Sequence, residues 1–126
     1  MKVLIVEDIE YRQNFIKKTI EIPDADCTKY AEKGLELLSE NNYDLVFLDH
    51  DLIGVKSGSY LTQKWFKNWK KFQTQKPIVI IHSMNLVGAT RMENYLKGIS
   101  NVTEKVTFKL IAKGWVDLKA LIAELE

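Results

Sequence analysis

Three short apolar runs, each followed by polar or acidic side chains, limit the folds open to this chain more than any other feature. The runs are residues 3–6, 45–48 and 78–81, and each is a continuous stretch of Val, Ile, Leu or Phe. Continuous apolar strands are typical of parallel sheets that helices cover on both faces. We therefore predict that the three runs are buried strands of such a sheet.

Amphipathic stretches lie between and after these runs. Apolar residues recur at helical spacing in five stretches, namely about residues 11–20, 31–41, 60–72, 90–97 and 118–125. Weaker strand patterns at 27–30 and 106–111 complete an alternation of five strands with five helices. Such alternation predicts an α/β fold with a five-stranded parallel sheet and helices on both of its faces.

Length, charge and cysteine content narrow the class of protein. The 126 residues suit one domain, and we expect a single domain over residues 1–126 with no attached output domain. The 18 basic and 17 acidic side chains nearly cancel, so charge gives no general reason to expect a nucleic-acid or membrane partner. Cys27 is the single cysteine, which fits a reducing, cytoplasmic compartment. The apolar runs are far too short to cross a membrane, and the N-terminus does not have the pattern of a signal peptide.

Polar side chains follow all three apolar runs. Glu7 and Asp8 follow the first, residues 49–51 (Asp-His-Asp) the second, and residues 82–83 (His-Ser) the third. Ligands of open parallel sheets bind outside the carboxyl ends of the strands, so we expect these groups to converge at one edge. Converging carboxylates require a cation, and few carboxylates with room for water favour Mg²⁺.

At this point the motifs resemble a known family. Residues 4–8, 44–49 and 77–83 resemble, in the right order, three strands and strand ends of response-regulator receiver (CheY-like) domains. A more specific resemblance is to the divergent branch described as cyclic-phosphate-processing receiver-like domains. It rests on residues 48–52, on Ser57-Gly58, and on residues 81–85 and 88–92. The resemblance implies a doubly wound, flavodoxin-like fold.

The resemblance also implies roles for individual residues. Glu7 and Asp8 would hold Mg²⁺, and Asp49 would bind the metal and attack a phosphoryl group to form an aspartyl phosphate. Ser83 would donate a hydrogen bond to a phosphoryl oxygen. The phosphoryl group would come from a phosphodonor, and signalling would run through a partner protein.

The last strand departs from the receiver pattern. Receivers end this strand in Lys-Pro, and residues 111–115 match it only in part, with Lys113 in the place of the lysine and Gly114 in that of the proline. Lys109 is the competing candidate. Ile53 also stands where receivers usually carry a proline after the phosphoacceptor.

Two further functions remain open, and the first of them involves Asp51. Residues two apart on a strand can face the same side, so Asp51 could give Asp49 general acid–base help in a small phosphohydrolase or cyclic-phosphate-processing protein. His50, Ser83 and Asn85 would then be catalytic or would bind substrate. Alternatively, Asp51 turns outward and only its backbone carbonyl binds the metal. The third reading is a pseudo-receiver that binds a partner without phosphotransfer.

The helix predicted over residues 60–72 carries lysines and aromatic residues together. A solvated lysine face opposite an aromatic core stripe is the interpretation we favour over a nucleic-acid site. The two Trp and two Phe of this helix exceed what a narrow stripe needs, which leaves room for a homodimer or partner surface. The residues concerned are Lys64, Trp65, Phe66, Lys67, Trp69, Lys70, Lys71 and Phe72.

Overall fold

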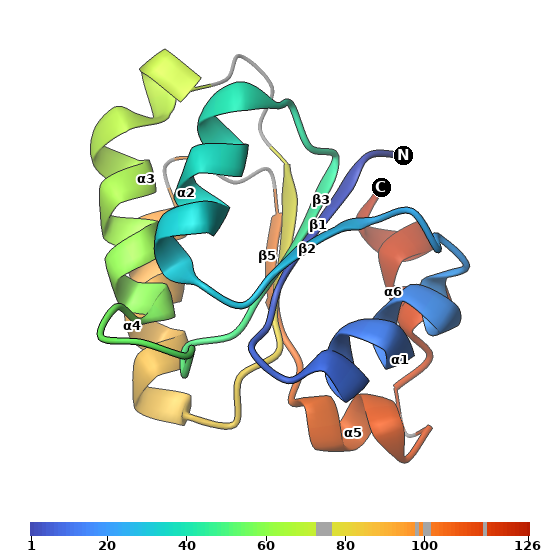
Figure 1. Ribbon diagram of the computed structural model, residues 1–126. Helices are drawn as coiled ribbons and strands as arrows, with labels where there is room; N and C mark the ends of the chain where they lie inside the picture. Colours follow the sequence, from blue (N-terminus) through green and yellow to red (C-terminus); the bar gives the residue numbers. More distant parts are fainter. Residues whose placement is uncertain (73–76, 98, 100–101, 115) are drawn as a thin grey trace.

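Five parallel strands form the central sheet of the computed structural model, which describes residues 1–72, 77–97, 99, 102–114 and 116–126. The strands are β1 (Val3–Val6), β2 (Asp26–Thr28), β3 (Leu45–Leu48), β4 (Ile78–Ile81) and β5 (Val102–Lys105). Their order in the sheet is β2-β1-β3-β4-β5. The predicted five-stranded parallel α/β fold is confirmed (Figure 1).

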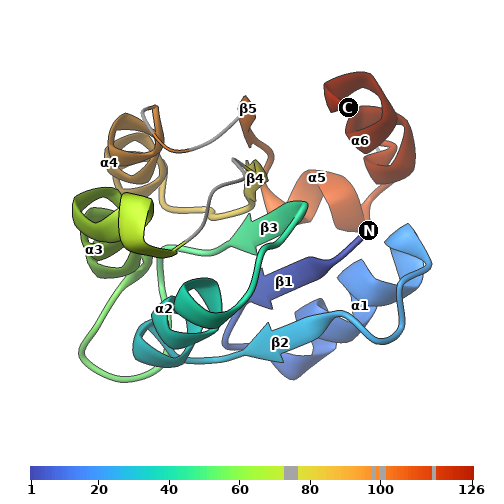
Figure 2. The ribbon, with the colours of Figure 1, turned by 90° about the horizontal axis from the view of Figure 1, so that it is seen from above.

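Helices cover both faces of the sheet. They are α1 (Glu10–Ile20), α2 (Ala31–Glu40), α3 (Gly58–Phe72), α4 (Leu86–Leu96), α5 (Phe108–Ala112) and α6 (Leu118–Leu125). Figures 1 and 2 show α2, α3 and α4 on one face and α1, α5 and α6 on the other. None of the described helices is long and apolar enough to cross a membrane.

The apolar strands divide their side chains between two cores. Leu4, Val6 and Leu48 face α2, α3 and α4, whereas Ile5 and Phe47 face the helices of the opposite side. Successive strand residues point to opposite faces, so a strand with a core on each side must be apolar throughout. This explains why the three runs do not alternate with polar residues.

The prediction of the last strand over 106–111 is wrong. β5 lies earlier, at Val102–Lys105, and residues 108–111 of the predicted strand belong instead to the short helix α5. The Thr107 hydroxyl accepts a hydrogen bond from the backbone N–H of Leu110, which caps this helix. Phe108 and Ile111 are three residues apart and are both buried in the core beside α1 and α6. The chain therefore has six helices in its described part rather than five.

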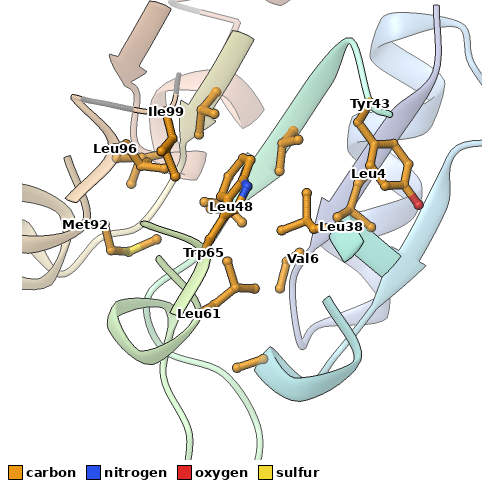
Figure 3. Close-up of a cluster of buried hydrophobic side chains, with 14 of the residues drawn as sticks. Leu4, Val6, Leu38, Tyr43, Leu48, Leu61, Trp65, Met92, Leu96 and Ile99 are labelled. Atoms are coloured by element: carbon orange, nitrogen blue, oxygen red, sulfur yellow. The ribbon is translucent and has the colours of Figure 1, made fainter. Parts of the chain in front are cut away.

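Trp65 is the largest side chain in the core between the sheet and α3, and it is fully buried (Figure 3). Trp69 is partly buried against the same core, so the aromatic stripe of α3 is mainly structural. Phe66 is 46% exposed and contacts Tyr95 of α4 at a ring-centroid distance of 6.2 Å. Lys67 is exposed, as a solvated lysine face predicts, whereas the side chains of Lys70 and Phe72 lie outside the described set. A homodimer through this helix stays a prediction.

Truncating Trp65 should strongly destabilise the fold. We expect Trp65→Ala to lower the free energy of unfolding by about 3–5 kcal/mol, because a buried indole leaves a cavity that the surrounding core fills only in part. The matched change Phe66→Ala, one residue on at the surface, should cost about 1 kcal/mol or less. Urea denaturation of both variants measures the difference, and equal losses would contradict the described core.

Candidate functional site

The register of the sheet brings the polar strand ends together. Val6 pairs with Leu48 and Leu48 pairs with Ile81, so the next residues of the three strands, Glu7, Asp49 and His82, are neighbours. The backbone bonds continue past the strands, because Asp49 N–H donates to the Val6 carbonyl and His82 N–H to the Leu48 carbonyl, each at 3.0 Å. The predicted convergence at one edge of the sheet is confirmed for these groups.

Glu7, Asp49 and His82 form a buried cluster of ionisable side chains. One ligand atom from each lies within 4.8 Å of the others, and the three residues are 0%, 5% and 0% exposed. In the described part of the chain, no other group of three His, Cys, Asp or Glu residues is placed so that it could hold a metal. The sequence interpretation named Glu7 and Asp49 as metal ligands but placed His82 outside the metal set.

Glu7 is held by contacts on both of its carboxylate oxygens. Its Oε2 accepts a hydrogen bond from the Ile9 N–H at 3.2 Å, and its Oε1 lies 3.3 Å from His82 Nε2 and 3.8 Å from Arg12 Nη1. Burial raises the pKa of Glu7, but the adjacent His82 ring outweighs it and holds the pKa well below its usual range. Glu7 is therefore an anion in spite of its burial.

Asp49 has the opposite balance. Burial raises its pKa to about 6, and the charge of Glu7 adds to this, while His82 and the Ser83 hydroxyl act against it. Ser83 lies at the predicted position beside Asp49, and its Oγ also accepts from the backbone N–H of Asn85 at 3.0 Å. The charged form of Asp49 is thus under-compensated at neutral pH, which favours a bound cation.

Asp8 lies beside the cluster rather than in it. It is only partly buried, and the three-residue cluster does not include it. Burial raises its pKa, and a contact with the Glu7 carboxylate raises it further. Asp8 is therefore a third carboxylate next to Glu7 and outside the buried cluster, and its role as a metal ligand stays a prediction.

Asp51 turns away from Asp49. Its side chain is 71% exposed, and its Oδ1 lies 2.8 Å from Nδ1 of His50 and 3.3 Å from Nδ2 of Asn85. Asn85 also caps α4, because its Oδ1 accepts from the Gly88 N–H at 2.9 Å. Of the two alternatives for Asp51, the structure has the one in which the side chain turns outward. In that alternative only the backbone carbonyl of Asp51 would bind a metal.

Two glycines permit the close packing of this loop. A Cβ atom on Gly88 would lie 2.4 Å from Cγ of His50, so the imidazole rests directly on the first turn of α4. A Cβ atom on Gly58 would lie 2.4 Å from the backbone oxygen of Asp49. Any larger residue at either place would push the loop that follows Asp49 out of position.

The structure corrects the position of the strand-end lysine. Lys113 follows α5 as its C-cap, and Lys109 lies within α5, so neither ends a strand. The last strand ends instead in Lys105, followed by Val106. Lys105 Nζ pairs with Oε1 of Glu93 in α4 at 3.3 Å. The error followed directly from placing the strand too late in the chain.

With this geometry established, comparison with known proteins identifies the family. The family model described as the cyclic-phosphate processing receiver domain matches residues 2–98. The chain belongs to this family. No curated protein matches it in sequence.

Solved structures of receiver domains share its fold. A CheY-like receiver domain from Methylobacillus flagellatus has 20% identity and a TM-score of 0.64, covering 100% of this chain and 98% of that one. The response regulator TrrA from Thermotoga maritima, solved in complex with Mg²⁺-BeF, has 19% identity and a TM-score of 0.66 over 100% of both chains. The receiver domain of the histidine kinase CKI1 from Arabidopsis thaliana, solved with Mg²⁺ and BeF₃⁻, has 15% identity and a TM-score of 0.69, covering 98% and 88%.

Removing the charge of Asp49 should stabilise the metal-free receiver domain at neutral pH. The raised pKa means that Asp49 favours the folded state below about pH 4 and loses that contribution as the pH rises through about 6. We expect Asp49→Asn to gain up to about 3 kcal/mol of unfolding free energy at pH 8 and much less at pH 4.

Chemical denaturation in EDTA at both pH values tests this. Asp51→Asn is the matched control, because the neighbouring His50 lowers the pKa of Asp51 and its exposed side chain has no buried charge to relieve. A gain at pH 8 that is no larger for Asp49→Asn than for the control would contradict the account.

Proposed function

We propose that this receiver domain binds Mg²⁺ at its acidic pocket, accepts a phosphoryl group on Asp49 and signals through a partner protein. The observation that carries the proposal is the burial of Asp49 together with its raised pKa. It is a buried carboxylate at the end of β3, with Glu7 on one side and the Ser83 hydroxyl on the other. The fold and the family membership support the phosphoryl-accepting role.

The side chains present fit a divalent cation. Oε1 of Glu7 is buried without a hydrogen-bond partner in the described structure, and the charge of Asp49 is under-compensated. Asp8 adds a third carboxylate at the partly exposed side of the cluster. Hard carboxylate oxygens with access to water suit Mg²⁺, and the two relatives solved with Mg²⁺ and a beryllium fluoride support its assignment here. When bound, the metal would neutralise charge on the transferring phosphoryl group.

The phosphorylation step needs few groups. A carboxylate oxygen of Asp49 attacks the phosphorus atom of the phosphodonor, forming the acyl–phosphate bond while the donor's leaving group departs with the electron pair. The Ser83 hydroxyl is placed to donate a hydrogen bond to a phosphoryl oxygen. We assign Lys105 to the place of the lysine that ends the last strand of receivers. For Lys105 to act at the phosphoryl group, its ion pair with Glu93 would have to break.

The contacts of Ser83, Asn85 and Lys105 connect the acidic site to the surface helix α4. Ser83 and Asn85 join the pocket to the first turn of α4, and Lys105 joins β5 to Glu93 in that helix. Rearrangement of Ser83 and Lys105 around a phosphoryl group would therefore shift α4. In this proposal a partner protein binds α4, and the signalling takes place in the cytoplasm.

A phosphohydrolase or cyclic-phosphate-processing activity is the second candidate. The family description supports it, and so does the polar group of His50, Asp51 and Asn85 beside the loop that follows Asp49. In this reading the group binds or protonates substrate, and Asp49 still binds the metal or attacks the phosphorus. The outward orientation of Asp51 makes receiver chemistry the better supported function.

Intact mass spectrometry after incubation with Mg²⁺ and acetyl phosphate tests the proposal. We expect one added phosphoryl group on the wild type and on Asp24→Asn, which changes an exposed aspartate elsewhere on the surface, and none on Asp49→Asn. Wild type with no adduct and the donor left intact would contradict receiver chemistry. Rapid donor consumption without an adduct, dependent on both Asp49 and Asp51, would favour the hydrolase.

A further inference from the structure

His82 is a buried polar side chain that lacks the hydrogen bonds such groups usually make. It is fully buried, and neither Nδ1 nor Nε2 has a hydrogen-bond partner among the described residues. Buried polar groups are nearly always paired, and each exception needs a reason, such as an ion that occupies the place of the missing partner. Its Nε2 lies 3.3 Å from Oε1 of Glu7, which is likewise buried without a hydrogen bond.

We propose that His82 is a third protein ligand of the cation held by Glu7 and Asp49, and that the pocket therefore prefers a first-row transition metal such as Mn²⁺ to Mg²⁺. The inference rests on the proposed function, because it concerns the same metal pocket. It changes the ligand set from carboxylate oxygens alone to two carboxylates and one imidazole.

The distances support a shared ion. Nε2 of His82 and Oε1 of Glu7 are 3.3 Å apart but do not have hydrogen-bond geometry. Two ligands at right angles on one ion, each with a bond of about 2.1 Å, are separated by about 3 Å. The Asp49 carboxylate completes the set, with all three ligand atoms within 4.8 Å of one another. Only a small contraction is needed to bring each donor to bonding distance.

The contacts around Glu7 favour this arrangement. The Ile9 N–H holds Oε2, which leaves Oε1 directed at His82. A hydrogen bond that orients a ligating carboxylate in this way is usual around protein metal sites. The ring centroids of Phe47 and His82 are 6.2 Å apart, so the imidazole also packs beside an apolar ring.

The donor chemistry decides the kind of metal. Mg²⁺ is bound by carboxylates and waters and gains little from an imidazole ligand, whereas Mn²⁺, Fe²⁺ and Zn²⁺ accept mixed oxygen and nitrogen sets. Many oxygen sites already favour Mn²⁺ somewhat over Mg²⁺. The specific expectation is therefore that His82 increases this preference, and that removing its nitrogen reduces the preference by about tenfold or more.

Mn²⁺ is a suitable probe because its unpaired electrons report the nuclei of its ligands directly. Electron spin-echo modulation of Mn²⁺ bound to the full chain should show a directly bound imidazole nitrogen, and the pattern should change when the histidines are labelled with ¹⁵N. The chain has only two histidines, so His50→Gln and His82→Gln identify the ligand. We expect the nitrogen signal to persist in His50→Gln and to vanish in His82→Gln.

Calorimetric titration with Mn²⁺ and Mg²⁺ gives the second readout. We expect His82→Gln to weaken Mn²⁺ binding at least tenfold and to change Mg²⁺ binding by less than threefold. The wild-type nitrogen signal needs no substitution at His82, so the proposal remains testable if that variant fails to fold. Tight Mn²⁺ binding without a nitrogen signal would overturn the inference and leave the proposed function intact. Absence of binding by either metal would contradict both.

Discussion

The register of the parallel sheet buries three ionisable side chains at the carboxyl ends of its apolar strands β1, β3 and β4. Glu7, Asp49 and His82 directly follow strands that are aligned by their backbone hydrogen bonds, so the register that fills the two cores also forces these groups together. Burying two carboxylates beside each other is costly unless charge compensates them. The adjacent His82 ring keeps the pKa of Glu7 low, whereas burial keeps the pKa of Asp49 raised. That remaining imbalance supports the proposal that this edge of the sheet binds a cation.

The loops around this edge connect the pocket to the helices. The loop after Asp49 is fixed by His50, which packs on Gly88 of α4, and by Gly58, which allows α3 to begin against the Asp49 backbone. Asn85 bonds to the same loop and caps α4. The loop that follows Asp49 is thus linked by hydrogen bonds to the first turn of α4. This linkage is the structural basis of the proposed signalling through α4.

Much of this architecture could be predicted from local patterns. The continuous apolar runs place β1, β3 and β4 exactly at their observed bounds, and the residues that follow them indicate Glu7, Asp49 and Ser83. The last strand could not be found in this way, because the Val-Thr-Glu-Lys sequence of β5 has a weaker apolar signal than residues 106–111, which alternate like a strand but form the capped helix α5. Lys105 was missed with it. His82 was left out of the metal set because a sequence shows neither the alignment of β4 with β3 nor the burial of an imidazole beside Glu7.

The central claim is that Mg²⁺ and Asp49 together form a phosphoryl-accepting pocket. Fluorine NMR with Mg²⁺ and beryllium fluoride tests it most directly, because this phosphoryl mimic can bind where a carboxylate, a cation and hydrogen-bond donors surround one position. The account predicts resonances of bound fluoride that require both Mg²⁺ and the Asp49 carboxylate and that are absent from Asp49→Asn. Bound resonances that survive in Asp49→Asn, or their complete absence from a folded wild type with saturating Mg²⁺, would contradict it.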